Sequence, residues 1–289
     1  MFRGTITAII TPFRKDGSID EEALRRLVTF QEENGADAIV PCGSTGESAT
    51  LSFDEHLRVV GIVVDQVKRA KVIAGAGSNS TSEAISLSRR SEAAGADGIL
   101  SISPYYNKPT QEGIFRHYKA ITESISVPLI VYNIPGRTAS NITADTLLRI
   151  AELPGIAGVK EASGNLEQIQ RILDGRPKGF SVLSGDDPLT YEMMRMGADG
   201  TISVASNCVP ARISKMVSHC LSGKMNDALA VHTELSPLFA ALFCETNPIP
   251  IKYIMAKMGY GSGTLRLPLT ELTEKNRAAV DSVMKSIGL

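Results

Sequence analysis

The chain has 289 residues, 43% of them hydrophobic, and its 30 Lys and Arg side chains against 31 Asp and Glu leave a formal net charge of -1. A chain of this length can bury a large core and fits either one α/β barrel or two smaller domains. Its balanced charge supplies no broad positive field for nucleic acid or anionic lipid, so we expect a small-molecule partner and neither nucleic acid nor a membrane.

Eight short apolar segments recur along most of the chain. They consist almost continuously of Ile, Val, Ala and Leu rather than alternating with polar residues, which is typical of parallel strands covered on both faces. We predict strands at residues 5–10, 38–41, 72–76, 98–102, 128–132, 156–160, 180–183 and 200–204.

Helical patterns lie between these segments, and several carry a start signal. The tetrapeptides at 52–55 and 80–83 begin with Ser and end with Glu, which predicts a capping box at each helix start. Asp187 followed by Pro188 predicts a cap with proline in the first turn. The switch from strand to helix periodicity is what a βαβ unit requires.

A Gly-Ala-Asp motif recurs three times where a predicted helix ends and a strand begins. Its glycines, Gly35, Gly95 and Gly197, suit the left-handed residue that closes a helix, because glycine has no Cβ to clash there. The same junction is therefore reused, and eight strand-helix alternations predict a closed barrel.

Strand signals stop after about residue 208, and we predict helices at 210–221, 226–243, 248–258 and 270–287. The predicted fold class is α/β, a (β/α)8 TIM barrel at residues 1–224 with a helical C-terminal domain at 225–289. A doubly wound open sheet is the competing architecture, but no Gly-x-Gly-x-x-Gly follows the first strand.

Signals for targeting, metals and cofactors are missing from the sequence. The N-terminal residues lack a signal-peptide layout, and no apolar run approaches the roughly 18 residues of a membrane helix, so we expect a soluble, unprocessed, cytoplasmic protein. The cysteines form no Cys-x-x-Cys pair and the four histidines are dispersed, which predicts reduced core thiols, no metal and no cofactor. The cysteines are Cys42, Cys208, Cys220 and Cys244.

Lys160 closes an apolar predicted strand, and in such a barrel the working residues lie at the C-terminal strand ends. A buried ammonium is costly, and desolvation lowers the pKa of a lysine by up to about 3 to 5 units. The neutral amine is a carbonyl nucleophile. A lysine that forms a salt bridge with the neighbouring Glu161 is the alternative interpretation.

Hydroxyl groups stand at two other predicted strand ends. Tyr132 offers a phenol that can shuttle protons, or it is only a core aromatic. Ser44 and Thr45 lie in a glycine-flanked turn whose hydroxyls and N–H groups can hold a carboxylate or relay a proton.

Two loops beyond these strand ends carry further candidates. The planar guanidinium of Arg137 can bind a carboxylate through two hydrogen bonds. The alternative interpretation, an arginine that only faces solvent, agrees equally well with the sequence. Tyr105 and Tyr106 are adjacent aromatics, a pattern of an interface or lid, or else an isolated surface feature.

Seven segments form a dense set of motifs across nearly the whole chain. They are GSTGESATL at 43–51, PYYNKP at 104–109, YNIPGRT at 132–138, GVKEA at 158–162, SGDD at 184–187, NPIP at 247–250 and LRLP at 265–268. Together they resemble the dihydrodipicolinate synthase family, which belongs with the N-acetylneuraminate lyases among the class I aldolases.

The resemblance implies an enzyme that holds pyruvate as a Schiff base on Lys160 and condenses it with L-aspartate 4-semialdehyde. It implies that Tyr132 donates and accepts protons and that Ser44 and Tyr106 complete the relay. In the family, the tyrosine matched by Tyr106 reaches into the neighbouring subunit's site. A homo-oligomer, a dimer of dimers, is therefore implied.

The resemblance also implies substrate contacts. Thr45 and the backbone at Ile202 would hold pyruvate, and Arg137 would bind the carboxylate of aspartate semialdehyde. The implied product is 4-hydroxy-tetrahydrodipicolinate, the entry to diaminopimelate and lysine.

Ser44 departs from the threonine usual in these synthases and is more typical of the N-acetylneuraminate lyases. The hydroxyl survives, so we expect the chemistry to persist, with a slower rate because serine lacks the methyl group that restrains the rotamer. Arg137 favours the synthase branch, since the sugar-acid lyases lack it. A lyase is the alternative function, and a keto-acid-binding regulator without turnover is a third.

Feedback inhibition by L-lysine at a subunit interface is implied as well. The residues that resemble the family's effector site are Ser48, Ala49, His56, Asn79, Glu83 and Tyr105. Glu83 would pair with the effector's amine. Phe53 stands where some inhibited members have histidine.

Overall fold

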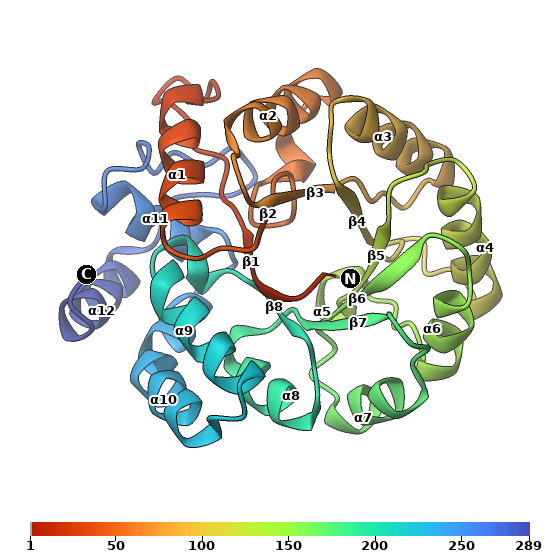
Figure 1. Cartoon of the computed structure of the whole chain (residues 1–289). Helices are drawn as coiled ribbons and strands as arrows, with labels where there is room; N and C mark the ends of the chain where they lie inside the picture. Colours follow the sequence, from red (N-terminus) through yellow and green to blue (C-terminus); the bar gives the residue numbers. More distant parts are fainter. Residues whose placement is uncertain (1) are drawn as a thin grey trace.

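The computed structural model describes residues 2–289 and contains a closed barrel of eight parallel strands (Figure 1). The strands follow one another in chain order, and β8 pairs with β1 to close the barrel. This confirms the predicted fold class and excludes the open sheet. The strands are β1 Gly4–Ala8, β2 Ala38–Val40, β3 Lys71–Gly75, β4 Gly98–Ile102, β5 Leu129–Asn133, β6 Ile156–Glu161, β7 Ser181–Ser184 and β8 Gly200–Ser203.

Helices surround the barrel and cover the outer face of its strands (Figure 1). Those between strands are α1 Glu21–Glu33, α2 Phe53–Gln66, α3 Thr81–Ala93, α4 Gln111–Thr122, α5 Pro135–Thr138, α6 Ala144–Ala151, α7 Leu166–Gly175 and α8 Thr190–Met196. Three short 3₁₀ segments are η1 Ser48–Thr50, η2 Asp187–Leu189 and η3 Ala205–Asn207. The segments after β2, β5 and β7 thus lead into the short helical segments η1, α5 and η2.

Four helices follow the barrel and gather on the side of β8, β1 and α1 (Figure 1). They are α9 Pro210–Leu221, α10 Met225–Ala241, α11 Ile249–Lys257 and α12 Glu274–Ser286. The last begins four residues after its predicted start, because Thr273 has extended backbone at its N-cap. The boundary predicted between residues 224 and 225 falls between α9 and α10, and the division into two domains stays a prediction. Met1, the first residue of the predicted barrel domain, lies outside the described residues.

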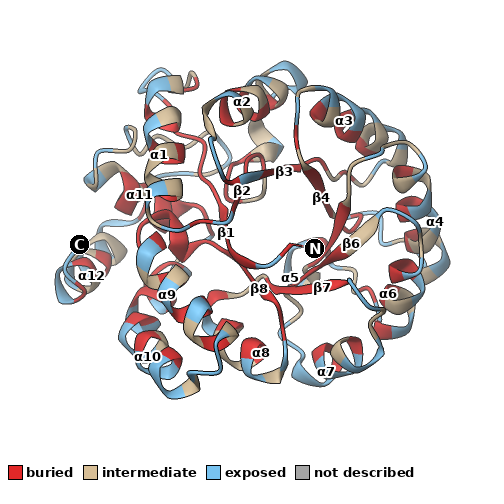
Figure 2. Cartoon of the chain, viewed as in Figure 1, coloured by how far each residue is buried: buried red, intermediate tan, exposed pale blue. Residues whose placement is uncertain are grey.

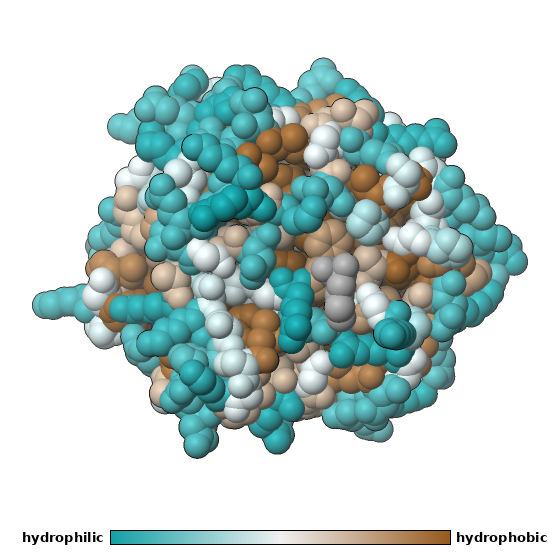
Figure 3. Space-filling model, viewed as in Figure 1, coloured by the Kyte–Doolittle hydropathy of each residue, from teal (hydrophilic) through white to brown (hydrophobic). Residues whose placement is uncertain are grey.

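Apolar side chains form two layers, one inside the barrel and one between the strands and helices. The strands are buried along their length, whereas the helices alternate between buried and exposed faces (Figure 2). The inner layer includes Ile6, Val40, Ile130, Tyr132, Leu183 and Ile202. On the face seen in Figure 3, hydrophilic side chains predominate, with apolar atoms visible as patches among them. Burial on both faces explains why the strands lack alternation.

The start signals were only partly correct. Ser52 and Glu55 form the predicted capping box at α2. Ser80 precedes α3, but its side chain makes no cap bond, because Glu83 instead accepts from the hydroxyl of Ser78. Asp187 is not a cap either: η2 begins after Asp186, and the Asp187 side chain bonds elsewhere.

The three junction glycines have the predicted left-handed backbone. Gly35, Gly95 and Gly197 have φ values of +88°, +97° and +112°, each just after a helix. Any other residue would carry a strained Cβ there. The repeated motif therefore marks a real, repeated turn.

Residues 2–289 contain no helix that is long and apolar enough to cross a membrane. Within the same residues, no group of three or more His, Cys, Asp or Glu side chains is placed to hold a metal ion. Cys42, Cys208 and Cys220 are buried, as a core thiol should be, but Cys244 is exposed. The prediction of core thiols was therefore wrong for Cys244, which follows the end of α10, where the chain turns at the surface.

Candidate active site

Lys160 lies near the C-terminal end of β6 with only 5% of its surface exposed. Its strand neighbour Glu161 points to the opposite face of the sheet, where it accepts hydrogen bonds from the Asn133 amide and the Ser163 N–H. No carboxylate of residues 2–289 forms an ion pair with the Lys160 amine within 4.0 Å. The alternative of a Lys160–Glu161 salt bridge is therefore wrong.

Burial lowers the pKa of Lys160 to about 8, with Asp187 opposing the shift and Arg137 adding to it. At pH 7 such an amine is neutral in about one molecule in ten, against about one in 2,500 for an ordinary lysine. The amine is thus available as a nucleophile under physiological conditions.

Tyr132 and Lys160 are directly paired across β5 and β6. The lysine Nζ lies 4.3 Å from the centre of the Tyr132 ring. Burial raises the pKa of Tyr132 to about 12, although Arg137 and the Ser44 hydroxyl lower it in part. The phenol is therefore protonated at neutral pH and is placed to give a proton at the amine.

Ser44 and Thr45 lie in a tight turn after β2, closed by a backbone bond from the Gly46 N–H to the Gly43 carbonyl. Ser44 lines a cavity of about 480 Å³ together with Tyr132. Thr45 is buried behind it, where its hydroxyl accepts a 3.0 Å hydrogen bond from the Asn247 amide.

Arg137 also lines this cavity, at the end of the short α5. Its guanidinium donates to the backbone carbonyl of Asn247 at 2.8 Å, which leaves its other N–H groups free to meet a ligand. Asn247 therefore bridges Arg137 and Thr45. Asn247 lines the cavity, and its side-chain Oδ1 is buried without a partner among the described residues.

Sequence reasoning missed two residues near the site: Asn247, which lines the cavity, and Asp187, which does not. Asn247 was quoted only within a motif, and nothing local shows that a residue just before α11 returns to the rim. Asp187 was taken for a helix cap, but it is buried and accepts from the N–H groups of Val204 and Ala205 at 3.0 and 2.9 Å. It acts on Lys160 through its charge.

Gly185 fixes the path of the Lys160 side chain. A Cβ at Gly185 would lie 2.9 Å from Cε and 3.0 Å from Cγ of Lys160, closer than real Cβ contacts allow. Only glycine therefore lets β7 pass this close to the amine.

Ile202 and Tyr106, like Lys160 and Thr45, are not among the residues that line this cavity. Ile202 on β8 is fully buried inside the barrel, in the same apolar cluster as Tyr132. Tyr106 is 87% exposed, and its N–H bonds the Thr138 carbonyl at 3.3 Å. Its phenol projects from the surface and does not line this chain's own cavity.

The cavity extends from the Ser44 turn towards α2 and α3. Five of the six predicted effector residues line it: Ser48, Ala49, His56, Glu83 and Tyr105. Asn79 does not; its carbonyl accepts a hydrogen bond from the Asn107 amide. Burial lowers the pKa of His56, so the ring is neutral at pH 7, and its Nε2 is buried without a partner among the described residues.

The arrangement supports carbonyl chemistry through an amine. A neutral lysine adds to a carbonyl carbon, the adjacent phenol moves the protons, and an arginine fork binds a carboxylate. These groups come from the ends of β5 and β6, and with the Ser44 turn after β2 they lie on one rim of the barrel, as the sequence predicted.

Residues 1–287 match the model of the dihydrodipicolinate synthetase family. The 4-hydroxy-tetrahydrodipicolinate synthase of Syntrophus aciditrophicus is 52% identical over 100% of this chain and 99% of its own length. The chain is thus similar to the synthase branch along its whole length.

Solved structures show the same barrel. The chloride-inhibited dihydrodipicolinate synthase of Acinetobacter baumannii, complexed with pyruvate, has a TM-score of 0.98 and 42% identity, covering 100% of this chain and 99% of its own. The DHDPS of Cyanidioschyzon merolae with lysine bound has a TM-score of 0.97 and 42% identity, with the same coverage.

Proposed function

Because the chain belongs to the dihydrodipicolinate synthetase family, we propose that Lys160 carries pyruvate as a Schiff base during the synthesis of 4-hydroxy-tetrahydrodipicolinate. The chain is a lyase, and its reaction condenses pyruvate with L-aspartate 4-semialdehyde in the diaminopimelate route to lysine. One observation carries the assignment of Lys160: its amine is buried, lacks a carboxylate partner within residues 2–289, and lies 4.3 Å from the Tyr132 ring centre.

The amine attacks the ketone carbon of pyruvate, and loss of the carbinolamine hydroxyl as water leaves an imine on Lys160. Removal of a methyl proton gives an enamine, whose carbon forms the new bond to the aldehyde carbon of the second substrate. The aldehyde oxygen takes up a proton. Attack of the second substrate's own amine on the imine carbon then releases Lys160 and closes the ring.

Each proton step needs a donor or acceptor close to the imine. Tyr132 is the proposed donor and acceptor, because its phenol is protonated and lies beside Lys160. Ser44 contacts the phenol from the turn after β2, so it is the next member of the relay. Tyr106 points away from its own cavity, which fits a role in the site of a partner subunit. A homo-oligomer follows from this proposal, and a dimer of dimers is the assembly that we propose.

The substrates' carboxylates need separate contacts. Thr45 and the backbone at Ile202 are proposed to hold pyruvate near Lys160. Arg137 is proposed to bind the carboxylate of aspartate semialdehyde with the N–H groups that Asn247 does not use. Arg137→Ala should therefore weaken use of the second substrate and leave the pyruvate adduct intact.

Lysine is proposed to bind at the α2 and α3 end of the cavity. Glu83 supplies a carboxylate for its amine, and Ser48, His56 and Tyr105 supply walls. Millimolar L-lysine should then lower turnover, and Glu83→Gln should abolish this effect.

We place the enzyme in the cytoplasm.

A trapping experiment tests the central proposal. Borohydride added with pyruvate should reduce the imine and add a pyruvyl group to the protein, mapped by mass spectrometry to Lys160. A coupled assay should show consumption of aspartate semialdehyde, with N-acetylneuraminate as the comparison substrate. An adduct on another residue, or none, would refute the role of Lys160.

A further inference from the structure

A second group of charged residues lies beneath the Ser44 turn, and of these only Glu47 borders the cavity described above. Glu47 ends this turn in a left-handed conformation, with φ of 54°. Its side chain is fully buried, and Oε1 meets the Lys252 amine at 2.5 Å, while Lys252 is 1% exposed on α11. The two residues are 205 positions apart in the sequence.

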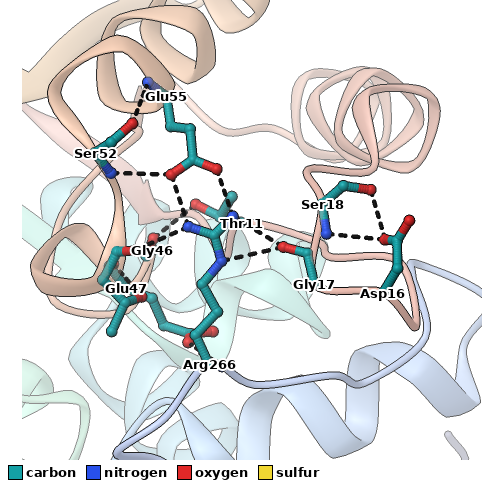
Figure 4. Close-up of polar contacts among 10 residues, drawn as sticks. Thr11, Asp16, Gly17, Ser18, Gly46, Glu47, Ser52, Glu55 and Arg266 are labelled. Atoms are coloured by element: carbon teal, nitrogen blue, oxygen red, sulfur yellow. Dashed lines mark hydrogen bonds and ion pairs between the residues drawn. The ribbon is translucent and has the colours of Figure 1, made fainter.

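Arg266 completes the group from the segment that follows α11. Its backbone N–H donates to Glu47 Oε2 at 3.1 Å. Its guanidinium holds Glu55 at the start of α2 through two bonds and donates to the carbonyls of Gly17 and Thr50 (Figure 4). The C-terminal segment is thereby tied to the loop after β1 and to both ends of η1.

An aromatic ring fills the space between the two cations. Lys252 Nζ lies 4.0 Å and the Arg266 guanidinium carbon 4.4 Å from the centre of the fully buried Phe13 ring. Such cation–π contacts stabilise desolvated cations. Both carboxylate oxygens of Glu47 are satisfied, so the cluster holds one geometry.

The turn above this cluster has little freedom. The Thr11 hydroxyl donates to the Gly46 carbonyl at 2.7 Å, and a Cβ at Gly46 would lie 3.1 Å from the Cys42 nitrogen. Ser44 and Thr45 directly precede this anchor. A displacement of Glu47 therefore moves both hydroxyls relative to Tyr132.

We propose that the Glu47–Lys252 ion pair, with Arg266, is a positioning device that fixes the Ser44 and Thr45 hydroxyls for catalysis by anchoring their turn to the C-terminal helices. This inference rests on the proposed function, because it assigns these hydroxyls to the reaction. None of the three residues touches substrate; each acts through the turn. The C-terminal helices then serve the active site.

The test is the double variant Glu47→Leu/Lys252→Met in the full-length enzyme. Replacing both charges by apolar side chains of similar volume leaves no unpaired buried charge, so the fold should survive. We expect kcat to fall at least tenfold and KM for pyruvate to rise. KM for aspartate semialdehyde should stay within twofold, since Arg137 keeps its contact with Asn247, and borohydride should still trap pyruvate on Lys160.

Arg176→Met is the matched control. Arg176 forms a half-buried ion pair with Asp199 at the opposite end of the barrel, before β7 and β8. Its loss should lower stability and leave kcat within twofold. A double variant with kcat within twofold of the unaltered enzyme, or a control with an equal loss, would overturn the proposal.

Lys252→Arg provides a second test if the double variant does not fold. It keeps the positive charge, but the larger planar group must displace Glu47. The same split between kcat and the two KM values is expected, and unchanged kinetics would overturn the proposal. If the unaltered enzyme itself fails to consume the two substrates, the proposed function falls and this inference falls with it.

Discussion

Lys160 at the end of β6 and Lys252 on α11 are both almost wholly buried, but only Lys252 contacts a carboxylate. Burial acts to lower the pKa of both amines, and at Lys252 the adjacent Glu47 acts against it. The pKa of each amine is about 8, so the partner is what distinguishes them: Lys252 is held in an ion pair as part of the scaffold, while no carboxylate of residues 2–289 forms an ion pair with Lys160. Burial by itself therefore does not separate a nucleophile from a structural lysine.

Removing the unpaired amine of Lys160 tests this comparison with the largest expected effect on kcat. Lys160→Ala should lower kcat by at least about 1,000-fold, because no other amine is placed to form the imine. The protein should keep its circular dichroism spectrum. Pyruvate with borohydride should leave the mass of this variant unchanged, and an adduct at Lys252 would contradict the comparison.

Removal of the paired amine should lower stability as well as displace the Ser44 turn. Lys252→Met leaves Glu47 buried without its partner, which should lower the free energy of unfolding by about 3–5 kcal/mol. Urea denaturation measures this change. Lys257, also on α11, forms a half-exposed pair with Asp281 on α12; Lys257→Met is the control and should cost no more than about 1 kcal/mol. Equal losses of unfolding free energy in the two variants would contradict this prediction. They would show that the buried Glu47–Lys252 pair contributes no more to stability than the half-exposed pair.

A smaller change moves the unpaired amine without removing it. Gly185→Ala places a methyl group 2.9 Å from both Lys160 Cε and Ala162 Cβ, so the Lys160 side chain must leave its observed path beside Tyr132. We expect the rate of borohydride trapping to fall by about tenfold, or about 1.4 kcal/mol in the barrier. Gly136→Ala is the control, since a Cβ there meets nothing within 4 Å. An unchanged trapping rate in Gly185→Ala would contradict the close fit.

The pH dependence sharpens the comparison further. Adduct formation needs the neutral amine, so its rate should rise about tenfold per pH unit below the pKa of Lys160, about 8, and level off above it. The Asp187 charge raises this pKa, so Asp187→Asn should move the midpoint to lower pH. The Arg137 charge lowers it, so Arg137→Met should move the midpoint to higher pH. Shifts in the same direction would contradict these assignments.

Most of the fold was predictable because its signals are local. The predicted strands agree with the observed ones to within two residues at each end, since runs of Ile, Val and Ala mark strands buried on both faces. The capping box at Ser52 was correct and that at Ser80 was wrong. The difference is a local competition, because the nearby Ser78 hydroxyl accepts from the Ser80 N–H and donates to the Glu83 carboxylate that the box required.

The candidate site was predictable wherever a reactive residue follows a strand. Lys160, Tyr132, Ser44 and Arg137 stand at strand ends, and parallel strands in a barrel place those ends on one rim. The sequence analysis missed Asp187 and Asn247 for different reasons. The first matched a common helix-start pattern, and the second lies beyond the barrel, where no periodicity points back to the rim.

The sequence by itself determined the eight strands, most of the helices and the position of Lys160 at a strand end, because each depends on a few neighbouring residues. Only the tertiary structure decided which buried lysine is paired. Glu47 and Lys252 are 205 positions apart, and Thr45 and Asn247 are 202 apart. Such contacts form only when the closed barrel and its C-terminal helices bring distant segments together, and no local pattern encodes that distance.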